Sequence, residues 1–192
     1  PSDFIHEIKD VFAGYKIRLI TLNKSYRSTQ PITNFAKALL PEHDHIQAFN
    51  RAGDMPEVLT VSSAEATAAL SRLVTRLLTV DSTVAILTKD AKTAAQLYAT
   101  LKLDTPVTLL SANDHSLKNG CVILPVYLAK GLEFDAVVGW DISATTYRNE
   151  ADRDILYTLC SRALHHLTLV TLDAPSPLIT ALPTDLYRRT GD

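Results

Sequence analysis

Short apolar runs that alternate with helix-like patterns constrain the fold of this chain more than any other feature. Residues 84–88 and 122–126 are apolar on consecutive positions, as strands buried on both faces are. A helical pattern over residues 90–103 follows the first run. Its expected inner face holds Ala94, Leu97, Tyr98 and Leu101. Strands that alternate with helices predict an α/β three-layer sandwich with a mainly parallel central sheet.

The same patterns give the other expected elements. Strands are predicted at 18–22, 58–61, 107–110, 136–140 and 167–172. Helices are predicted to start at 29–31, with Pro31 in the first turn, and to span 63–78 and 151–164. Their expected buried residues are Ile32, Phe35, Ala36 and Leu39 in the first, and Ala66, Leu70, Leu73, Val74 and Leu77 in the second. Residues 41–56 are expected to form a loop, and 174–183 an irregular tail.

The length and composition fit a single ordinary domain. The chain has 192 residues, a net charge of −2 and a pI near 6.3, so no global basic field attracts nucleic acid. Cys121 and Cys160 lie in apolar segments and are expected to be buried, reduced thiols. The sequence shows no signal peptide and no apolar run of membrane-spanning length, which favours a cytoplasmic protein with no membrane contact.

Residues Ser25, Tyr26, Arg27, Ser28 and Thr29, called here the 25–29 segment, follow one expected strand and precede a helix. Loops at the carboxyl ends of strands are the usual ligand sites of open α/β sheets. Taken alone, the dipeptide Tyr26-Arg27 is better explained as an exposed arginine beside a partly buried tyrosine.

Two further segments stand out. Residues 130–135 (Lys-Gly-Leu-Glu-Phe-Asp, the 130–135 segment) precede an expected strand, and Gly131 there can adopt a φ closed to other residues. Residues 156–163 (Leu-Tyr-Thr-Leu-Cys-Ser-Arg-Ala, the 156–163 segment) carry Arg162 near the expected end of a helix. A basic residue is favoured at a helix C-terminus for electrostatic reasons alone.

In this order, the three segments resemble the last three motifs of the UvrD/Rep-like superfamily 1 helicases. The resemblance implies a RecA-like fold in which Tyr26 stacks on adenine and Arg27 reaches the γ-phosphate. It also implies that Glu133 contacts the ribose, in a loop with Gly131, and that Arg162 acts as the arginine finger. A guanidinium suits phosphate because it stays charged and donates paired hydrogen bonds.

The chain departs from the family pattern at several positions. Ser25 replaces the usual Asn, while Pro125 and Tyr127 replace a Thr and a His that lie near nucleic acid in the family. Residues 125–135 resemble more closely the DNA helicase IV/HelD-like branch, some of whose members act on RNA polymerase.

The phosphate-binding half of a motor is missing from the sequence. No Gly-Lys dipeptide occurs, so there is no P-loop, and no Asp-Glu pair follows an apolar strand to hold Mg²⁺. Residues 1–192 are therefore expected to be a single C-terminal RecA-like domain from a longer protein. ATP with Mg²⁺ would be shared with an N-terminal RecA-like domain, single-stranded DNA would be a partner, and the isolated domain would be inactive.

Two alternatives to a DNA helicase stay open at this point. The domain can belong to an ATP-dependent factor that remodels RNA polymerase, or it can be an inactive RecA-like scaffold that binds protein. A metal site is not expected, because the six histidines, including His43, His45, His165 and His166, lack structural-zinc spacing. They are expected to be solvated or capping residues.

Overall fold

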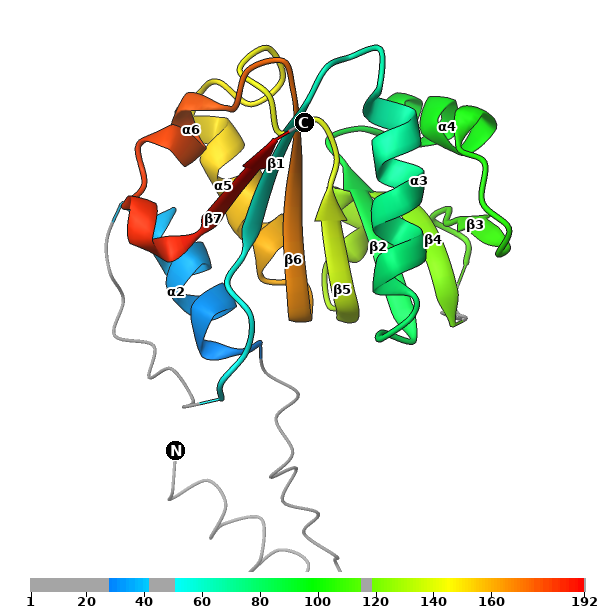
Figure 1. Ribbon diagram of the computed structural model, residues 1–192, viewed down its shortest axis with the longest axis horizontal. Coiled ribbons are helices and arrows are strands. Elements are labelled where there is room, and N and C mark those ends of the chain that lie inside the picture. Colours follow the sequence, from blue (N-terminus) through cyan, green and yellow to red (C-terminus); the bar gives the residue numbers. More distant parts are fainter. Residues whose placement is uncertain (1–27, 42–50, 115–118, 192) are drawn as a thin grey trace, which may run out of the picture.

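The computed structural model describes residues 28–41, 51–114 and 119–191, which form a seven-stranded, all-parallel sheet (Figure 1). The strand order is β3-β4-β2-β5-β6-β1-β7. The strands are β1 (Glu57–Val61), β2 (Thr83–Thr88), β3 (Val107–Leu109), β4 (Gly120–Pro125), β5 (Phe134–Gly139), β6 (Ala163–Leu172) and β7 (Arg188–Gly191). The predicted parallel sheet is therefore confirmed, whereas the strand expected at 18–22 lies outside the described residues.

Consecutive apolar residues in the central strands supply two separate cores. In β2, Ala85 and Leu87 join the core on one face, while Val84 and Ile86 join the core on the other. The alternation follows from the two-residue period of a strand, so that a continuous apolar run needs cover on both faces. This arrangement is the three-layer sandwich that the sequence predicts.

Helices cover the two faces unequally. The first core is closed by α2 (Gln30–Ala38), η1 (Val126–Ala129), α5 (Glu150–Cys160) and α6 (Pro177–Thr180). The second is closed by α3 (Ala66–Leu77) and α4 (Ala91–Thr100). Pro31 lies in the first turn of α2, as predicted, where a missing N–H costs no helical hydrogen bond. The buried residues expected for α2 and α3 are all buried.

Several predicted details were wrong. Tyr98 is 45% exposed instead of packed under α4, although Ala94, Leu97 and Leu101 are buried as expected. Helix α5 ends at Cys160, and β6 starts at Ala163, so residues 161–164 are not helical. Strand β7 was not predicted, and the expected irregular tail contains α6, whose Leu178 and Ile179 are buried.

The other global expectations concern cysteines and membranes. Cys121 and Cys160 are buried free thiols, and burial raises the pKa of Cys121 to about 12. Within the described part of the chain, no helix combines the length and apolarity that crossing a bilayer needs.

Candidate functional site

The sheet topology brings the 130–135 segment and Arg162 to the same edge of the molecule. The 130–135 segment runs directly into β5, and Arg162 lies on the two-residue turn between α5 and β6. Because β5 and β6 are parallel neighbours with Phe134 paired to Ala163, the residues that precede them lie side by side. The shared edge is the amino-terminal one, at the bottom of Figure 1. Residues 130–135 and Arg162 thus lie at the end opposite to the one where ligands of α/β sheets usually bind.

The side chain of Arg162 is held against the 130–135 segment. Its Nη1 donates to the carbonyl oxygen of Leu132 at 3.4 Å, and its Nη2 donates to Ser161 Oγ at 3.1 Å. The backbone adds a further link, since the Phe134 N–H donates to the Arg162 carbonyl at 2.9 Å. Nε of Arg162 is buried and has no partner among the described residues. Arg162 therefore keeps unused hydrogen-bond donors at a position fixed by two motifs.

Gly131 and Glu133 complete the segment next to Arg162. Gly131 has a φ of +77°, in the left-handed region that favours glycine, which confirms the backbone conformation expected for it. Glu133 is exposed and makes no hydrogen bond or ion pair with any described residue. Its carboxylate is thus available to an external donor.

The end of the 25–29 segment lies beside Arg162 as well. The Ser28 hydroxyl donates to the Ala163 carbonyl, and the Thr29 N–H donates to the Leu164 carbonyl at 3.0 Å. Tyr26 and Arg27 lie outside the described residues, so their roles stay predictions. The contacts of Ser28 and Thr29 bring the described ends of all three sequence segments together at the start of β6.

A network that the sequence analysis missed fixes the other end of α5. Lys89, directly after β2, forms a 2.7 Å ion pair with Asp152 and donates to the Thr146 carbonyl at 2.6 Å. Its Nζ also lies 5.3 Å from the centre of the Tyr147 ring. Asn149 and Asp152 form a capping box at the start of α5. The spacing of these two residues was the available signal.

The charge on Asp152 is stabilised despite its burial. Burial alone would raise the pKa of this carboxyl, but hydrogen bonds from Asn149, Lys89 and Arg148 outweigh it and lower the pKa to about 2. The neighbouring Tyr147 is fully buried, and burial raises the pKa of its hydroxyl. Asp152 is therefore ionised at any physiological pH and anchors α5, whose last residue lies two positions before Arg162.

An exposed aromatic residue borders a pocket between η1 and α5. The pocket has a volume of about 270 Å³, and its lining includes Lys89, Val126, Tyr127, Lys130 and Ile155. Tyr127 is 57% exposed. Lys89 is engaged by Asp152, and Asp154 adds a carboxylate to the lining, so Lys130 and the Tyr127 ring are the groups that can hold a phosphate and stack on a base here.

The histidines do not form a metal site in the described residues. His166 lies between two carboxylates, with Nδ1 2.7 Å from Asp81 and Nε2 3.1 Å from Asp54, so its two nitrogens point to different partners. His165 lies 3.7 Å from Asp135. The described ranges contain no group of three or more His, Cys, Asp or Glu placed to hold a metal ion. His43 and His45 lie outside the described residues.

The described residues bring three kinds of group together at this edge. They supply a guanidinium with unused donors, a free carboxylate and a glycine turn at one edge. They supply neither a phosphate-cradling loop nor paired acids for a metal. Such an edge can complete a site whose phosphate-binding part belongs to another domain.

The fold and this edge together define a RecA-like α/β domain of the kind found in nucleotide-driven motors. A family model described as the UvrD-like helicase C-terminal domain matches residues 120–170, which include the 130–135 segment and Arg162. The crystal structure of the C-terminal domain of a possible DNA helicase from Lactobacillus plantarum WCFS1 aligns with a TM-score of 0.74 at 34% identity. The alignment covers 86% of this chain and 98% of that one. The chain belongs to the UvrD-like helicase C-terminal domain family.

More distant similarities involve viral helicases. Arterivirus nonstructural protein 10 (helicase), solved in complex with DNA, aligns at 10% identity and a TM-score of 0.45, over 71% of this chain and 35% of that one. The PRRSV helicase aligns at 13% identity and a TM-score of 0.44, over 84% and 31%. A comparison with curated protein sequences gives no significant match.

Proposed function

We propose that the chain is the C-terminal motor domain of an ATP-dependent DNA helicase or translocase. In this proposal, residues 1–192 are one RecA-like unit that completes an ATP site begun by a second, N-terminal RecA-like domain. Membership of the UvrD-like family supports the assignment to a helicase. The observation that carries the proposal is the guanidinium of Arg162, fixed against Leu132 and Ser161 while Nη1 and Nη2 each keep a second N–H.

The proposed roles follow from the chemistry of each side chain. Arg162 and Arg27 would meet the negative charge that grows on the phosphoryl oxygens, which a planar, permanently charged donor does well. Glu133 would accept hydrogen bonds from ribose hydroxyls, and Tyr26 would stack on the base. Mg²⁺-bound ATP would supply the phosphoryl group for hydrolysis, with its metal ligands on the other domain. The left-handed turn at Gly131 would hold Leu132 where Arg162 contacts it.

The pocket between η1 and α5 supports a contact with single-stranded nucleic acid. Tyr127 would offer its exposed face to a base, while Lys130 would attract the backbone. The net charge of −2 makes this attraction local, so that most of the affinity would come from the complete protein.

A second candidate function is supported by the sequence around this pocket. Pro125 and Tyr127 stand where most UvrD/Rep-like helicases have a Thr and a His, and residues 125–135 resemble the HelD-like branch. An ATP-dependent factor that remodels RNA polymerase would use Arg162 in the same way. Its partner would be a protein where a helicase would bind DNA. An inactive protein-binding scaffold would not depend on the arginines at all.

Measurement of phosphate release by the purified chain tests whether this domain needs a second domain to hydrolyse ATP. We expect no ATP hydrolysis above background, with or without single-stranded DNA, because charge neutralisation and phosphate positioning both lie elsewhere. Sustained turnover that copurifies with the chain through successive columns would contradict the proposal. Replacement of Arg162 in the complete ATPase distinguishes the helicase and remodelling candidates, which need this arginine, from the scaffold, which does not.

A further inference from the structure

The hydroxyl of Ser161 lies between the end of α5 and the guanidinium of Arg162. Ser161 is the C-cap residue, directly after the last helical residue of α5. Its Oγ donates to the Thr158 carbonyl oxygen at 2.9 Å and accepts from Nη2 of Arg162 at 3.1 Å. A guanidinium has no acceptor atom, so the hydroxyl can only accept from it and keeps its single proton for Thr158. The three groups therefore form one directed chain from the helix end to the arginine.

The contact with Ser161 holds the guanidinium more firmly than the contact with Leu132. The distance from Nη1 to the Leu132 carbonyl is 3.4 Å, which is long for an N–H···O hydrogen bond, whereas the distance from Nη2 to Ser161 is within the usual range. Nε is buried and has no hydrogen-bond partner among the described residues. Two contacts on different nitrogens fix the plane of the group, whereas one contact leaves it free to swing. The direction of the remaining N–H groups therefore depends on Ser161.

The end of α5 leaves the Thr158 carbonyl open for this hydroxyl. In a continuing helix the Arg162 N–H would bond that carbonyl, but here it donates to the Leu159 carbonyl at 3.2 Å. The last carbonyl oxygens of a helix also carry partial negative charge. A hydroxyl that donates to such an oxygen becomes a better acceptor itself, because linked hydrogen bonds polarise one another. The change from helix to strand at residues 161–163 thus creates the chain that reaches Arg162.

We propose that Ser161 is a positioning residue for the proposed arginine finger, whose hydroxyl aims the guanidinium of Arg162 and acts on phosphoryl transfer only through it. The inference rests on the proposed function of Arg162. It requires a hydroxyl at position 161, and not merely a small side chain. Serine and threonine meet that requirement, whereas alanine does not.

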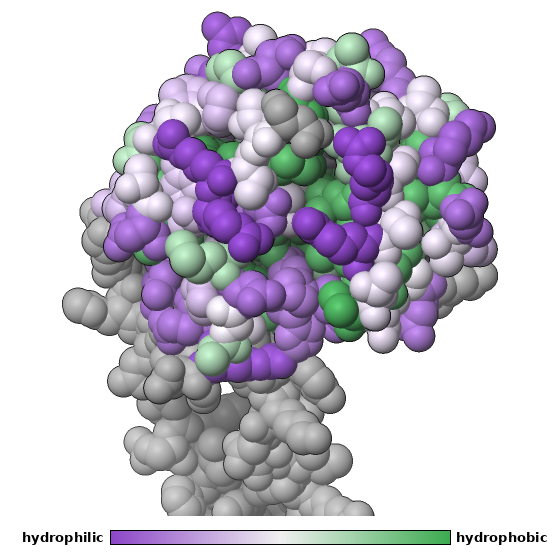
Figure 2. All heavy atoms as spheres, viewed as in Figure 1, coloured by the Kyte–Doolittle hydropathy of each residue, from purple (hydrophilic) through white to green (hydrophobic). Residues whose placement is uncertain are grey.

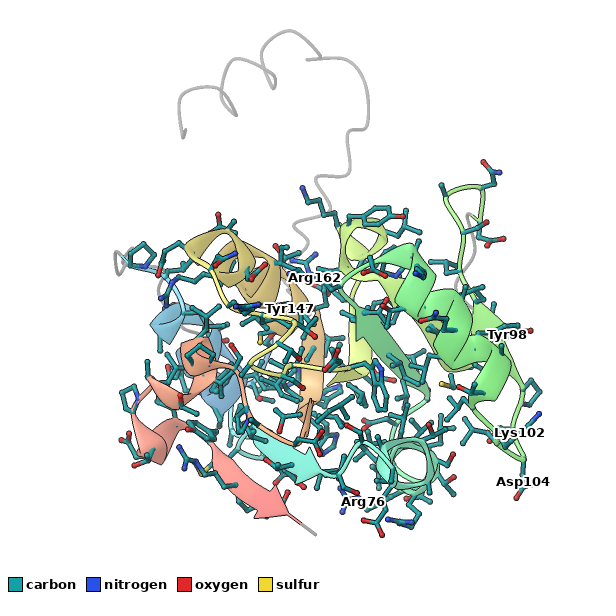
Figure 3. The ribbon with its side chains drawn as sticks, turned by 90° about the horizontal axis from the view of Figure 1, so that it is seen from above. Arg76, Tyr98, Lys102, Asp104, Tyr147 and Arg162 are labelled. Atoms are coloured by element: carbon teal, nitrogen blue, oxygen red, sulfur yellow. The ribbon has the colours of Figure 1, made fainter. Side chains whose placement is uncertain are left out.

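A simpler role for the hydroxyl is to stabilise the helix end, and Thr79 provides a matched control for that role. Thr79 Oγ1 donates to the Arg76 carbonyl at 2.6 Å, again three residues back, just beyond the end of α3. Arg76 and Arg162 lie on opposite sides of the sheet (Figure 3). Figure 2 shows the α3 side, where hydrophilic residues (purple) are widespread. Thr79→Ala therefore removes the same type of bond without reaching Arg162.

Nitrogen NMR of the 192-residue chain tests the contact itself. The measured quantity is the rate at which the Arg162 guanidinium rotates about its Nε–Cζ bond, with its signals assigned by their loss in Arg162→Lys. We expect Ser161→Ala to raise this rate about fivefold, the effect of one lost hydrogen bond, and Ser161→Thr and Thr79→Ala to leave it within about twofold of wild type. The inference is overturned if folded Ser161→Ala keeps the wild-type rate, or raises it no more than Thr79→Ala does.

Turnover of the complete ATPase that contains this domain tests the consequence. Ser161→Ala should lower kcat by about ten- to a hundredfold and leave the KM for ATP within about twofold, because a misaimed donor weakens only the transition state. Ser161→Thr should retain kcat, and Thr79→Ala should lower the melting temperature as much as Ser161→Ala does without any loss of kcat. If Arg162→Ala abolishes turnover but Ser161→Ala retains it, the inference fails and the proposed function stands. If Arg162→Ala itself retains turnover, both fail.

Discussion

Arg162 and Leu132 are joined although thirty positions separate them: Nη1 of the arginine donates to the leucine carbonyl at 3.4 Å. The contact exists because α5 returns the chain to the amino end of β6, directly beside the start of β5. It makes the position of the guanidinium depend on the turn at Gly131.

Replacement of Gly131 by Ala should strain the turn. No atom lies within 4 Å of a Cβ built at Gly131, so space is available, and the cost comes only from the φ of +77°. We expect a loss of about 1–2 kcal/mol in the free energy of unfolding, measured by urea denaturation. Gly191→Ala is the control, since its Cβ would make an ordinary 3.6 Å contact without a positive φ. Equal effects at both positions would show that the left-handed turn is unimportant.

The ion pair of Lys89 with Asp152 should contribute to stability. Asp152→Asn removes the charge but keeps the shape, and it leaves Lys89 without its 2.7 Å partner. We expect a loss of about 1–3 kcal/mol, because the carboxylate is buried and also caps α5. Glu150→Gln on the same helix removes an exposed acid that pairs with Arg153 and should leave the unfolding midpoint unchanged. A midpoint that moves in Glu150→Gln but not in Asp152→Asn would contradict this account.

The contribution of the Asp152 carboxylate to stability should depend on pH in the acid range. Its folded pKa of about 2 lies below the value of roughly 3.9 for an unfolded Asp, so its contribution is complete above about pH 4 and is lost as the pH falls towards 2. The pKa of Glu57 is also lowered: burial opposes its charge, but hydrogen bonds from Thr190 and Arg188 outweigh it. The informative quantity is therefore the difference between wild type and Asp152→Asn, which should shrink between pH 4 and pH 2. A stability difference that stays constant between pH 4 and pH 2 would contradict the low pKa of Asp152 in the folded protein.

Nucleic-acid binding by the chain should be weak and depend on Tyr127. Anisotropy with labelled oligo-dT should show affinity at low salt that falls steeply as salt is added, because local lysines act by counterion release. Tyr127→Ala should weaken binding about tenfold through lost stacking. Tyr98→Ala, at an exposed tyrosine on α4, should have little effect. Tight binding that persists at high salt, or equal losses in both variants, would remove the proposed contact.

The parts of this structure that follow from local pattern were predictable. Apolar runs such as that in β2 need cover on both faces, so the parallel sandwich follows from the sequence. Strand β7 could not be predicted in this way, because its residues Arg188–Gly191 carry no apolar pattern and form a strand only beside β1. Polar edge strands of this kind have no local signal.

The end of α5 shows how tertiary pairing outweighs local preference. Residues 161–164 suit a helix by pattern, but Ala163 pairs with Phe134 and extends β6 to meet β5. Arg162 therefore lies on a turn, and its contact with Leu132 could not be derived from spacing. The segments that carry the site were recognisable in the sequence, whereas the edge of the sheet at which they meet was not.

The central claim is tested most directly by the turnover of the complete ATPase that contains this domain, with Arg162 replaced. Arg162→Ala should lower kcat by about 10³–10⁵, and Arg162→Lys should fail as well, because it keeps the charge but loses the planar fork. The matched control is Arg153→Ala, in helix α5 just before Arg162, whose guanidinium pairs with Glu150 and donates to the Leu39 carbonyl. It should retain kcat, and melting temperatures should show that all three variants are folded. Near-normal turnover in folded Arg162→Ala would contradict the claim that this domain supplies the arginine of a working motor.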